Sequence, residues 1–291
     1  MTIINGLLVF TCFKHPLFYE NSRYILFVHL AINDFLELSF SLTMFLWVKI
    51  QLFVLIPVCY YFTFVASTTT TNTPLNLAVM CLERYVAICF PLRHSQICNL
   101  PRTYMAITVI WLLGMIPIAT EFIVSLRLQP AGFFRSIVLC DRQNTIRTAY
   151  QADIRSSFRS SYLVFVWLVI VSTYLRIAIA ARSASSSEKN SAKKARNTIL
   201  LHALQLLLMM MTFAASLTDQ LLMTLPSQMI QDVYFVRYYL VYIIPRVLSA
   251  VIYGLRDGNF RKHLRGHMAC FQKQVVPTLL CDTRTLQRLP E

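Results

Sequence analysis

The segment Met80–His94, which reads MCLERYVAICFPLRH, carries most of the information about the fold. It is the end of an apolar helix at a membrane interface, and it contains the adjacent acid–base pair Glu83 and Arg84. Such a pair holds together while dehydrated in one state and separates in another, which is typical of a conformational switch. The alternative is an ordinary interfacial Arg84 whose side chain reaches out to water.

The composition of the whole chain places this segment in a membrane protein. Of 291 residues, 56% are hydrophobic and 14% are charged, with a mean hydropathy of +0.56. Soluble domains contain about 45–50% apolar and about 25% charged residues. The 20 Phe and 14 Tyr exclude intrinsic disorder, because disordered segments are poor in aromatic residues.

Six apolar segments are long enough to cross a bilayer, which requires about 20 residues. They lie near 24–48, 58–82, 104–126, 160–182, 198–225 and 234–255. Runs of this length without strict alternation favour helices over the strands of a barrel. A further apolar stretch, 3–13, is too short to span alone. It is either an interfacial start or part of a first helix that begins upstream.

The basic residues predict the orientation of these segments. Of the 27 Lys and Arg, 18 lie in 11–23, 84–102, 176–196 and 254–291, which places the C-terminal tail and the 183–197 loop in the cytosol. The exception is the 126–159 loop, with six Arg on the opposite side. The net charge of +14 does not indicate nucleic-acid binding, because the basic residues form no single patch.

The cysteines agree with this orientation. Only Cys59 and Cys140 lie on the outer side, where oxidation is permitted, and two cysteines suffice for one disulfide. The alternative is two unpaired thiols.

The order Glu83-Arg84-Tyr85 followed by Val-Ala-Ile-Cys and Pro-Leu resembles the end of the third helix in olfactory receptors of the rhodopsin-like G-protein-coupled receptor superfamily. Further matches extend along most of the chain. They are 30–34 (second helix), Trp111 (fourth helix), 194–198 with His202 (start of the sixth) and 245–257 (end of the seventh, particularly in fish-type receptors).

The resemblance implies an all-α membrane protein with a seven-helix bundle. Asn5 would be the Asn of the first helix, so that helix is expected to be truncated at its N-terminal end. The receptor domain would cover 1–257, an amphipathic juxtamembrane helix 258–271, and a cytosolic tail 272–291. The 258–271 segment alternates apolar and basic residues, a pattern typical of a helix lying on an anionic leaflet.

The resemblance also assigns roles to individual residues. Glu83, Arg84, Tyr85 and Tyr253 would form the activation switch for G-protein coupling, and Cys59 would pair with Cys140. One departure is Ala250, which stands where the family's seventh helix has a proline. With the truncated first helix, this departure leaves open a non-signalling fragment.

A polar core is expected within the membrane. The resemblance groups Asp34 with Asn5, Thr73 and Ser249, in a position that holds sodium in related receptors. The alternative is a protonated Asp34 bonded to Ser, Thr or water.

The ligand pocket is expected beside the polar run Ser67–Thr73. By position, Ala66, Ser67, Thr70 and Thr71 would face the cleft of a rhodopsin-like bundle, with Met210 and Phe213 as adaptable apolar lining. Two simpler interpretations stay open. Hydroxyls can bond to their own helix carbonyls, and methionines can serve only as core packing.

The function implied is odorant detection. The partners would be a small-molecule odorant, a heterotrimeric G protein of the olfactory stimulatory type and the lipid bilayer, with no nucleic acid. The location would be the plasma membrane. No enzyme motif, cofactor or metal site beyond sodium is expected. Alternatives are a rhodopsin-like receptor for a non-odorant ligand and, less favoured, a transporter or channel.

Overall fold

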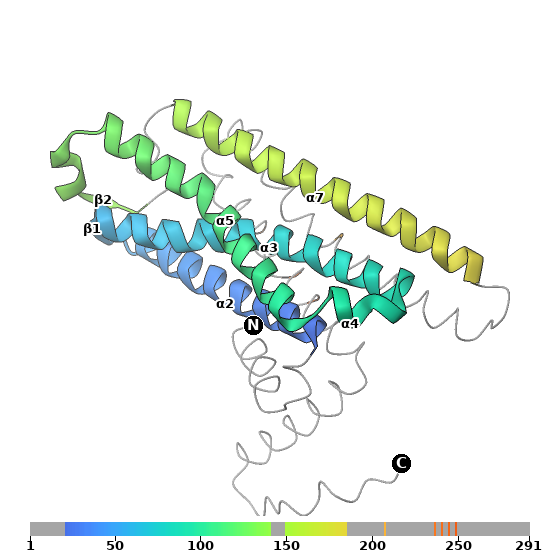
Figure 1. The fold of residues 1–291 in the computed structure, drawn as a ribbon. Coiled ribbons are helices and arrows are strands. Elements are labelled where there is room, and N and C mark those ends of the chain that lie inside the picture. Colours follow the sequence, from blue (N-terminus) through green and yellow to red (C-terminus); the bar gives the residue numbers. More distant parts are fainter. Residues whose placement is uncertain are drawn as a thin grey trace, which may run out of the picture.

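The computed structural model describes residues 21–140 and 149–184, together with the single residues 207, 236, 240, 244 and 248. Four long helices lie side by side in this part of the chain (Figure 1). They are α2 (Ser22–Lys49), α3 (Ile56–Cys89), α5 (Leu100–Leu128) and α7 (Ala149–Ala184). The short elements at the two ends are β1 (Phe53–Leu55), η2 (Pro91–Arg93), α4 (His94–Ile97), η3 (Ala131–Arg135) and β2 (Ile137–Leu139).

Two of the helices begin at asparagine caps. The side-chain oxygen of Asn21 accepts a hydrogen bond from the backbone N–H of Arg23 (3.1 Å), and that of Asn99 accepts one from Arg102 N–H (3.1 Å). These bonds satisfy amide groups that the first turn of a helix otherwise leaves unpaired. Pro101 follows the second cap, at a position where a helix needs no N–H.

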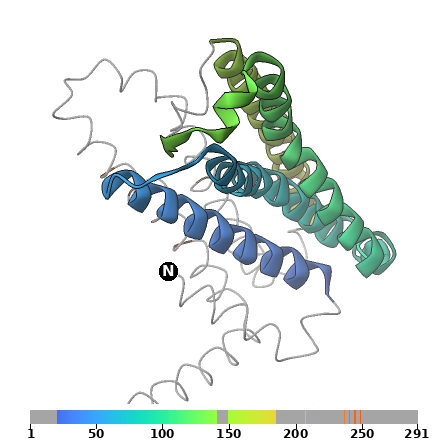
Figure 2. The same ribbon diagram turned by 90° about the vertical axis from the view of Figure 1, so that its left-hand side faces the viewer.

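Helix α3 is the centre of the described bundle. It contacts α2 on one side and both α5 and α7 on the other (Figures 1 and 2). The core between these helices is built from buried aliphatic and sulfur-containing side chains, including Leu26, Leu30, Leu77, Cys81 and Val166. A functional group on α3 therefore lies within reach of three other helices.

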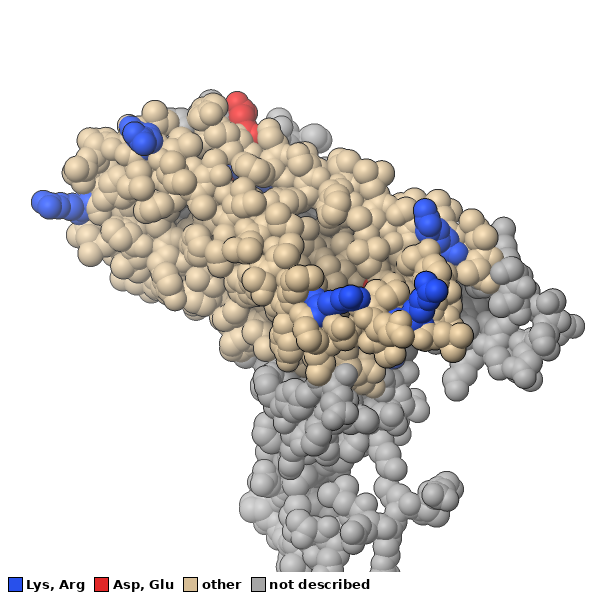
Figure 3. Space-filling model, in the orientation of Figure 1, with Lys and Arg blue, Asp and Glu red and all other residues tan. Residues whose placement is uncertain are grey.

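The outer faces of the helices are apolar. Leu112, Leu126, Leu168 and Ile179 are each more than half exposed. Most of the Lys and Arg surface visible in Figure 3 lies toward the two ends of the elongated body. Three helices are long and apolar enough to span a membrane, and α3 with the bent η2–α4 segment is a fourth candidate, within the described residues. Lipid, rather than water, is the solvent that suits this surface.

The two ends of the bundle differ. At one end, which we call the strand end, β1 and β2 form an antiparallel pair with Phe53 opposite Leu139 and Leu55 opposite Ile137. At the other, the α4 end, the chain bends by 116° between α3 and the η2–α4 segment. The sequence interpretation contained no strands, because three-residue strands are too short to show a period.

The first four predicted full-length spans, near 24–48, 58–82, 104–126 and 160–182, correspond to α2, α3, α5 and α7. Helix α7 begins at Ala149, so assigning the whole of 126–159 to a loop was wrong. Arginines mislead a hydropathy criterion when they are paired inside the protein. The predicted spans 198–225 and 234–255, the stretch 3–13 and the amphipathic helix 258–271 lie outside the described residues, apart from isolated positions.

Candidate functional site

At the α4 end, one buried carboxylate meets two basic side chains. Glu83 Oε2 lies 3.3 Å from Arg84 Nε, and Glu83 Oε1 lies 3.0 Å from His94 Nε2. The Glu83 side chain is only 6% exposed, whereas Arg84 and His94 lie nearer the surface. Tyr85 packs its ring edge-on against Phe90. The structure therefore brings Glu83 and Arg84 into contact, and adds His94, which the sequence interpretation did not include.

The charge of Glu83 influences the pKa of a nearby thiol, that of Cys98. Burial raises the pKa of the Cys98 thiol, the Glu83 carboxylate raises it further, and Arg102 acts in the opposite direction. Cys98 lies just after α4, in the connection to α5. Its thiol is consequently a local probe of the electrostatic state of Glu83.

In the middle of the bundle, a polar group links α2 to α3. Asn33 donates to the carbonyl oxygen of Thr69 (2.7 Å) and to Thr73 Oγ1 (2.9 Å). Thr73 Oγ1 in turn lies 3.5 Å from Asp34 Oδ1, and all four residues are buried. Of the predicted polar core, Asp34 and Thr73 are thus brought together, while Asn5 and Ser249 lie outside the described residues.

Helix α5 approaches α3 closely at Gly114. A Cβ atom at this position would overlap the side-chain amide of Asn72 and approach the backbone of Thr68. The Asn72 amide is best satisfied with its nitrogen donating to Ile110 O (3.1 Å) and Thr68 O (3.2 Å). The absence of a side chain at Gly114 therefore allows Asn72 to join the two helices.

A second polar chain connects three helices. Trp111 Nε1 donates to His29 Nε2 (3.0 Å), and His29 Nδ1 lies 3.2 Å from Asn76 Oδ1. Asn76 Nδ2 donates to the carbonyl oxygen of Leu26 (3.0 Å). The resemblance singled out Trp111 alone, because nothing in the sequence shows which side chains face it from α2 and α3.

The hydroxyl run on α3 makes local hydrogen bonds, and part of it is half-buried. Thr69, Thr70 and Thr71 all donate to carbonyl oxygens one turn earlier, which agrees with the interpretation that these hydroxyls bond to their own helix. The residues predicted to line a pocket are half-buried. They are Ala66, Ser67, Thr70 and Thr71. Met210, Phe213 and Tyr253 lie outside the described residues.

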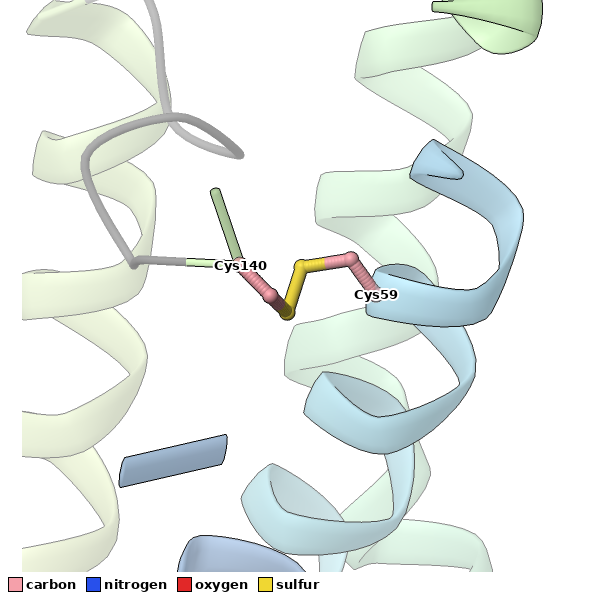
Figure 4. The surroundings of a disulfide bond; sticks show 2 residues. All are labelled: Cys59 and Cys140. Carbon is pink, nitrogen blue, oxygen red and sulfur yellow. A yellow bond between two sulfur atoms is a disulfide. The ribbon is translucent and has the colours of Figure 1, made fainter. Parts of the chain in front are cut away.

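At the strand end, a disulfide joins Cys59 to Cys140, with a Cα–Cα separation of 5.4 Å (Figure 4). Cys59 is in the first turn of α3 and Cys140 directly follows β2, so the bond ties the second inter-helix connection to α3. Ile56, Tyr60 and Phe133 form a small buried cluster beside it. The pairing implied by the resemblance is thus present in the structure.

Below this disulfide, α5 and α7 are joined by two polar contacts that the sequence interpretation missed. Ser125 Oγ accepts from Gln151 Nε2 (2.7 Å) and from Tyr60 OH (2.7 Å). One turn toward the bundle centre, Arg155 Nε and Nη2 donate to the two carboxylate oxygens of Glu121. The only sequence signal was the presence of charged residues close to apolar runs.

Comparison with known proteins extends beyond the described part of the chain. The profile of the 7 transmembrane receptor (rhodopsin family) matches residues 4–254. The chain is 34% identical to Odorant receptor 131-2 of Danio rerio, over 92% of this chain and 82% of that protein.

Two further similarities are more distant. Olfactory receptor 10P1 of Homo sapiens is 31% identical over 65% of this chain and 60% of its own length. Melatonin receptor type 1C of Gallus gallus is 25% identical over 71% of this chain and 60% of its own length.

Proposed function

Since the chain belongs to the rhodopsin family of seven-transmembrane receptors, we propose that it detects small odorants at the cell surface and activates a heterotrimeric G protein. The observation that carries this proposal is the similarity to an odorant receptor over 92% of the chain. The buried contact between Glu83 and Arg84 is consistent with a receptor that changes state. The G protein would be of the olfactory stimulatory type.

In this proposal the α4 end faces the cytosol and the strand end faces outward, with the C-terminal tail cytosolic. The arrangement agrees with the excess of Lys and Arg in the segments assigned to the cytosol. It also places the Cys59–Cys140 disulfide on the oxidising side of the plasma membrane.

The mechanism we propose is a population shift between two bundle states. In the resting state Glu83 holds Arg84, and a ligand that binds better to the other state favours their separation. Arg84 and Tyr253 would then rearrange to open a cytosolic surface for the G protein. His94 stays beside Glu83 in this scheme and keeps its contact with the Glu83 carboxylate after Arg84 has left.

Asp34 and Thr73 offer oxygen atoms as ligands, which suits a sodium ion, since a carboxylate and a hydroxyl oxygen lie together in a buried place. With Asn5 and Ser249 they would hold the ion between the helices. The cation would supply a counter-charge to Asp34, which is otherwise costly to bury in ionised form.

The test replaces Arg84. Arg84→Ala should reduce odorant-dependent cAMP to the level of untransfected cells while cell-surface labelling stays normal, because the switch loses its moving charge. Arg102→Ala is the matched control, since Arg102 is an exposed arginine at the same end of the bundle. Undiminished cAMP from the Arg84→Ala receptor would contradict the proposed switch.

A second candidate is a rhodopsin-like receptor for a non-odorant small molecule, which the similarity to a melatonin receptor favours. Activation by melatonin-like indoles, with no response to an odorant panel, would select this candidate. Ligand-driven flux without a G protein would instead identify a transporter or channel.

A further inference from the structure

The ion pair between Glu121 and Arg155 is unusual for its position. Both side chains are largely buried, with 7% and 13% exposed, inside helices that are apolar enough to span a membrane. Charged groups in such segments are costly and therefore tend to serve a function. A structural link between α5 and α7 is already present one turn away, where Gln151 donates to Ser125.

The guanidinium of Arg155 is only partly used by this pair. Its Nε and Nη2 donate to Glu121, whereas Nη1 is buried without a hydrogen-bond partner among the described residues. A guanidinium has N–H donors on two edges. One edge can therefore donate to a carboxylate while the other donates to a second anion. A buried donor of this kind calls for an explanation, and a bound anion is one that its chemistry fits.

A second unpaired polar atom lies at the same depth. Thr63 is buried, and its Oγ1 likewise has no partner in the described part of the chain. Tyr60, Ser125 and Gln151 meet in one layer. Along its own helix, each of Thr63, Glu121 and Arg155 is three or four residues from the member of this layer on the same helix, in the direction of the bundle centre. This spacing places all three roughly 5 Å deeper than the layer. Two unsatisfied groups from α3 and α7 thus lie in one layer.

The charge in this region favours an anion. Arg159 lies one turn after Arg155 on the same face of α7, so Arg155, Arg159 and Glu121 carry a net charge of +1. The stretch 126–159, which covers the connection between α5 and α7 and the first turns of α7, has six Arg and two Asp, although it lies at the end assigned to the outside. The positive-inside rule does not account for this excess, whereas attraction of an anionic ligand does.

We propose that Arg155 and Thr63 bind the carboxylate of a small organic acid, so that the ligands of this receptor are carboxylate-bearing molecules. The carboxylate accepts from Arg155 Nη1 and Thr63 Oγ1, while Glu121 orients the guanidinium from its other edge. This inference rests on the proposed receptor function. It also gives Glu121 an opposing effect, since its negative charge weakens the binding of an anion.

The experiment measures cAMP in cells that express the full chain. The probes are small carboxylic acids of several carbon skeletons, each paired with its methyl ester and its primary amide. We expect an acid to be active at a concentration at least about tenfold lower than its ester or amide, because a charge-assisted bond is lost in these analogues. Responses to esters and amides equal to or stronger than those to acids would overturn the proposal and leave the receptor function intact.

Three variants separate ligand binding from a structural role of the ion pair. Arg155→Gln should remove the response to the acid, and Glu121→Gln should make the acid more potent. If the ion pair only held α5 and α7 together, both variants would break it and both would respond less to the acid. Reduced responses in both variants would therefore overturn the proposal. Arg127→Gln is the matched control, because Arg127 is an exposed arginine at the same end of α5. The acid should be as potent on this variant as on the unaltered chain.

A readout without the G protein distinguishes failure of this inference from failure of the proposed function. The acids should raise the unfolding temperature of the purified, detergent-solubilised receptor, and Arg155→Gln should abolish that rise. Stabilisation without cAMP would support the acid site and count against the signalling function. Neither stabilisation nor cAMP from any acid would overturn the site. Thr63→Ala, which removes one hydroxyl, should reduce the stabilisation less than Arg155→Gln.

Discussion

The two ends of α3 are held by different kinds of interaction. At the strand end, Cys59 is covalently bonded to Cys140, and Tyr60 donates to buried Ser125. At the α4 end, the contacts of Glu83 with Arg84 and His94 are electrostatic. One end is fixed by a bond that stays closed in an oxidising compartment, and the other by contacts that reversible events can break.

This difference indicates where a change of state is cheapest. Breaking a disulfide requires a chemical reaction, whereas separating a buried ion pair requires compensation of the remaining charge. Glu83 already has a second partner in His94, so departure of Arg84 does not leave its carboxylate alone. We therefore expect signals to pass from the fixed strand end to the adjustable α4 end.

The largest effect should come from breaking the fixed end. Cys59→Ser opens a loop closed across a sequence separation of 81 residues. The expected loss of stability is on the order of 2–4 kcal/mol. It should appear as a lower unfolding temperature of the purified protein and reduced labelling at the cell surface. Cys89→Ser, which changes an unbonded half-buried thiol at the other end of α3, is the control. Equal effects of the two variants would contradict the comparison.

A moderate effect is expected from loosening the adjustable end. Glu83→Gln removes the charge that holds Arg84, so ligand-independent cAMP should rise by about tenfold, equivalent to roughly 1.4 kcal/mol. Surface labelling should stay near normal, because the neutral amide fills the same volume. Asp153→Asn changes an exposed acid on α7 and should leave basal cAMP unchanged. If Glu83→Gln left basal cAMP unchanged, the contact between Glu83 and Arg84 would not hold the resting state, and the α4 end would not be the adjustable one.

The smallest effect is chemical, and it sharpens the electrostatic account. The Glu83 carboxylate helps to raise the pKa of Cys98, so Glu83→Gln should lower that pKa. The thiolate fraction at neutral pH then rises, and maleimide labelling of Cys98 should become a few-fold faster. Cys89 lies in the field of Arg176 rather than Glu83, and its labelling rate should not change. Equal acceleration at both thiols would indicate general opening of the protein.

The sequence was informative where chemistry is local. Long apolar runs predict α2, α3 and α5 because membrane spans require them. The orientation predicted from the basic residues places Cys59 and Cys140 alone on the outer side, and these two cysteines are bonded in the structure. Glu83 and Arg84 are adjacent in the chain, so their contact needs no knowledge of the fold. These features depend on length, compartment or neighbouring positions.

Contacts between helices could not be predicted in the same way. The bonds from Glu121 to Arg155 and from Trp111 to His29 depend on the rotation of each helix about its own axis. In a membrane span the usual guide is missing, since apolar residues face both the core and the lipid. His94 was overlooked because the bend after α3 brings it back to a residue eleven positions earlier.

The disulfide also imposes an order on biosynthesis. Cys59 and Cys140 are separated by both α3 and α5, which cross the membrane in opposite directions between them in the proposed topology. Cys140 can therefore reach the oxidising lumen of the secretory pathway only after both helices have inserted. Closure of this bond records that half of the bundle has the right topology. A chain with either helix misplaced would retain two unpaired thiols.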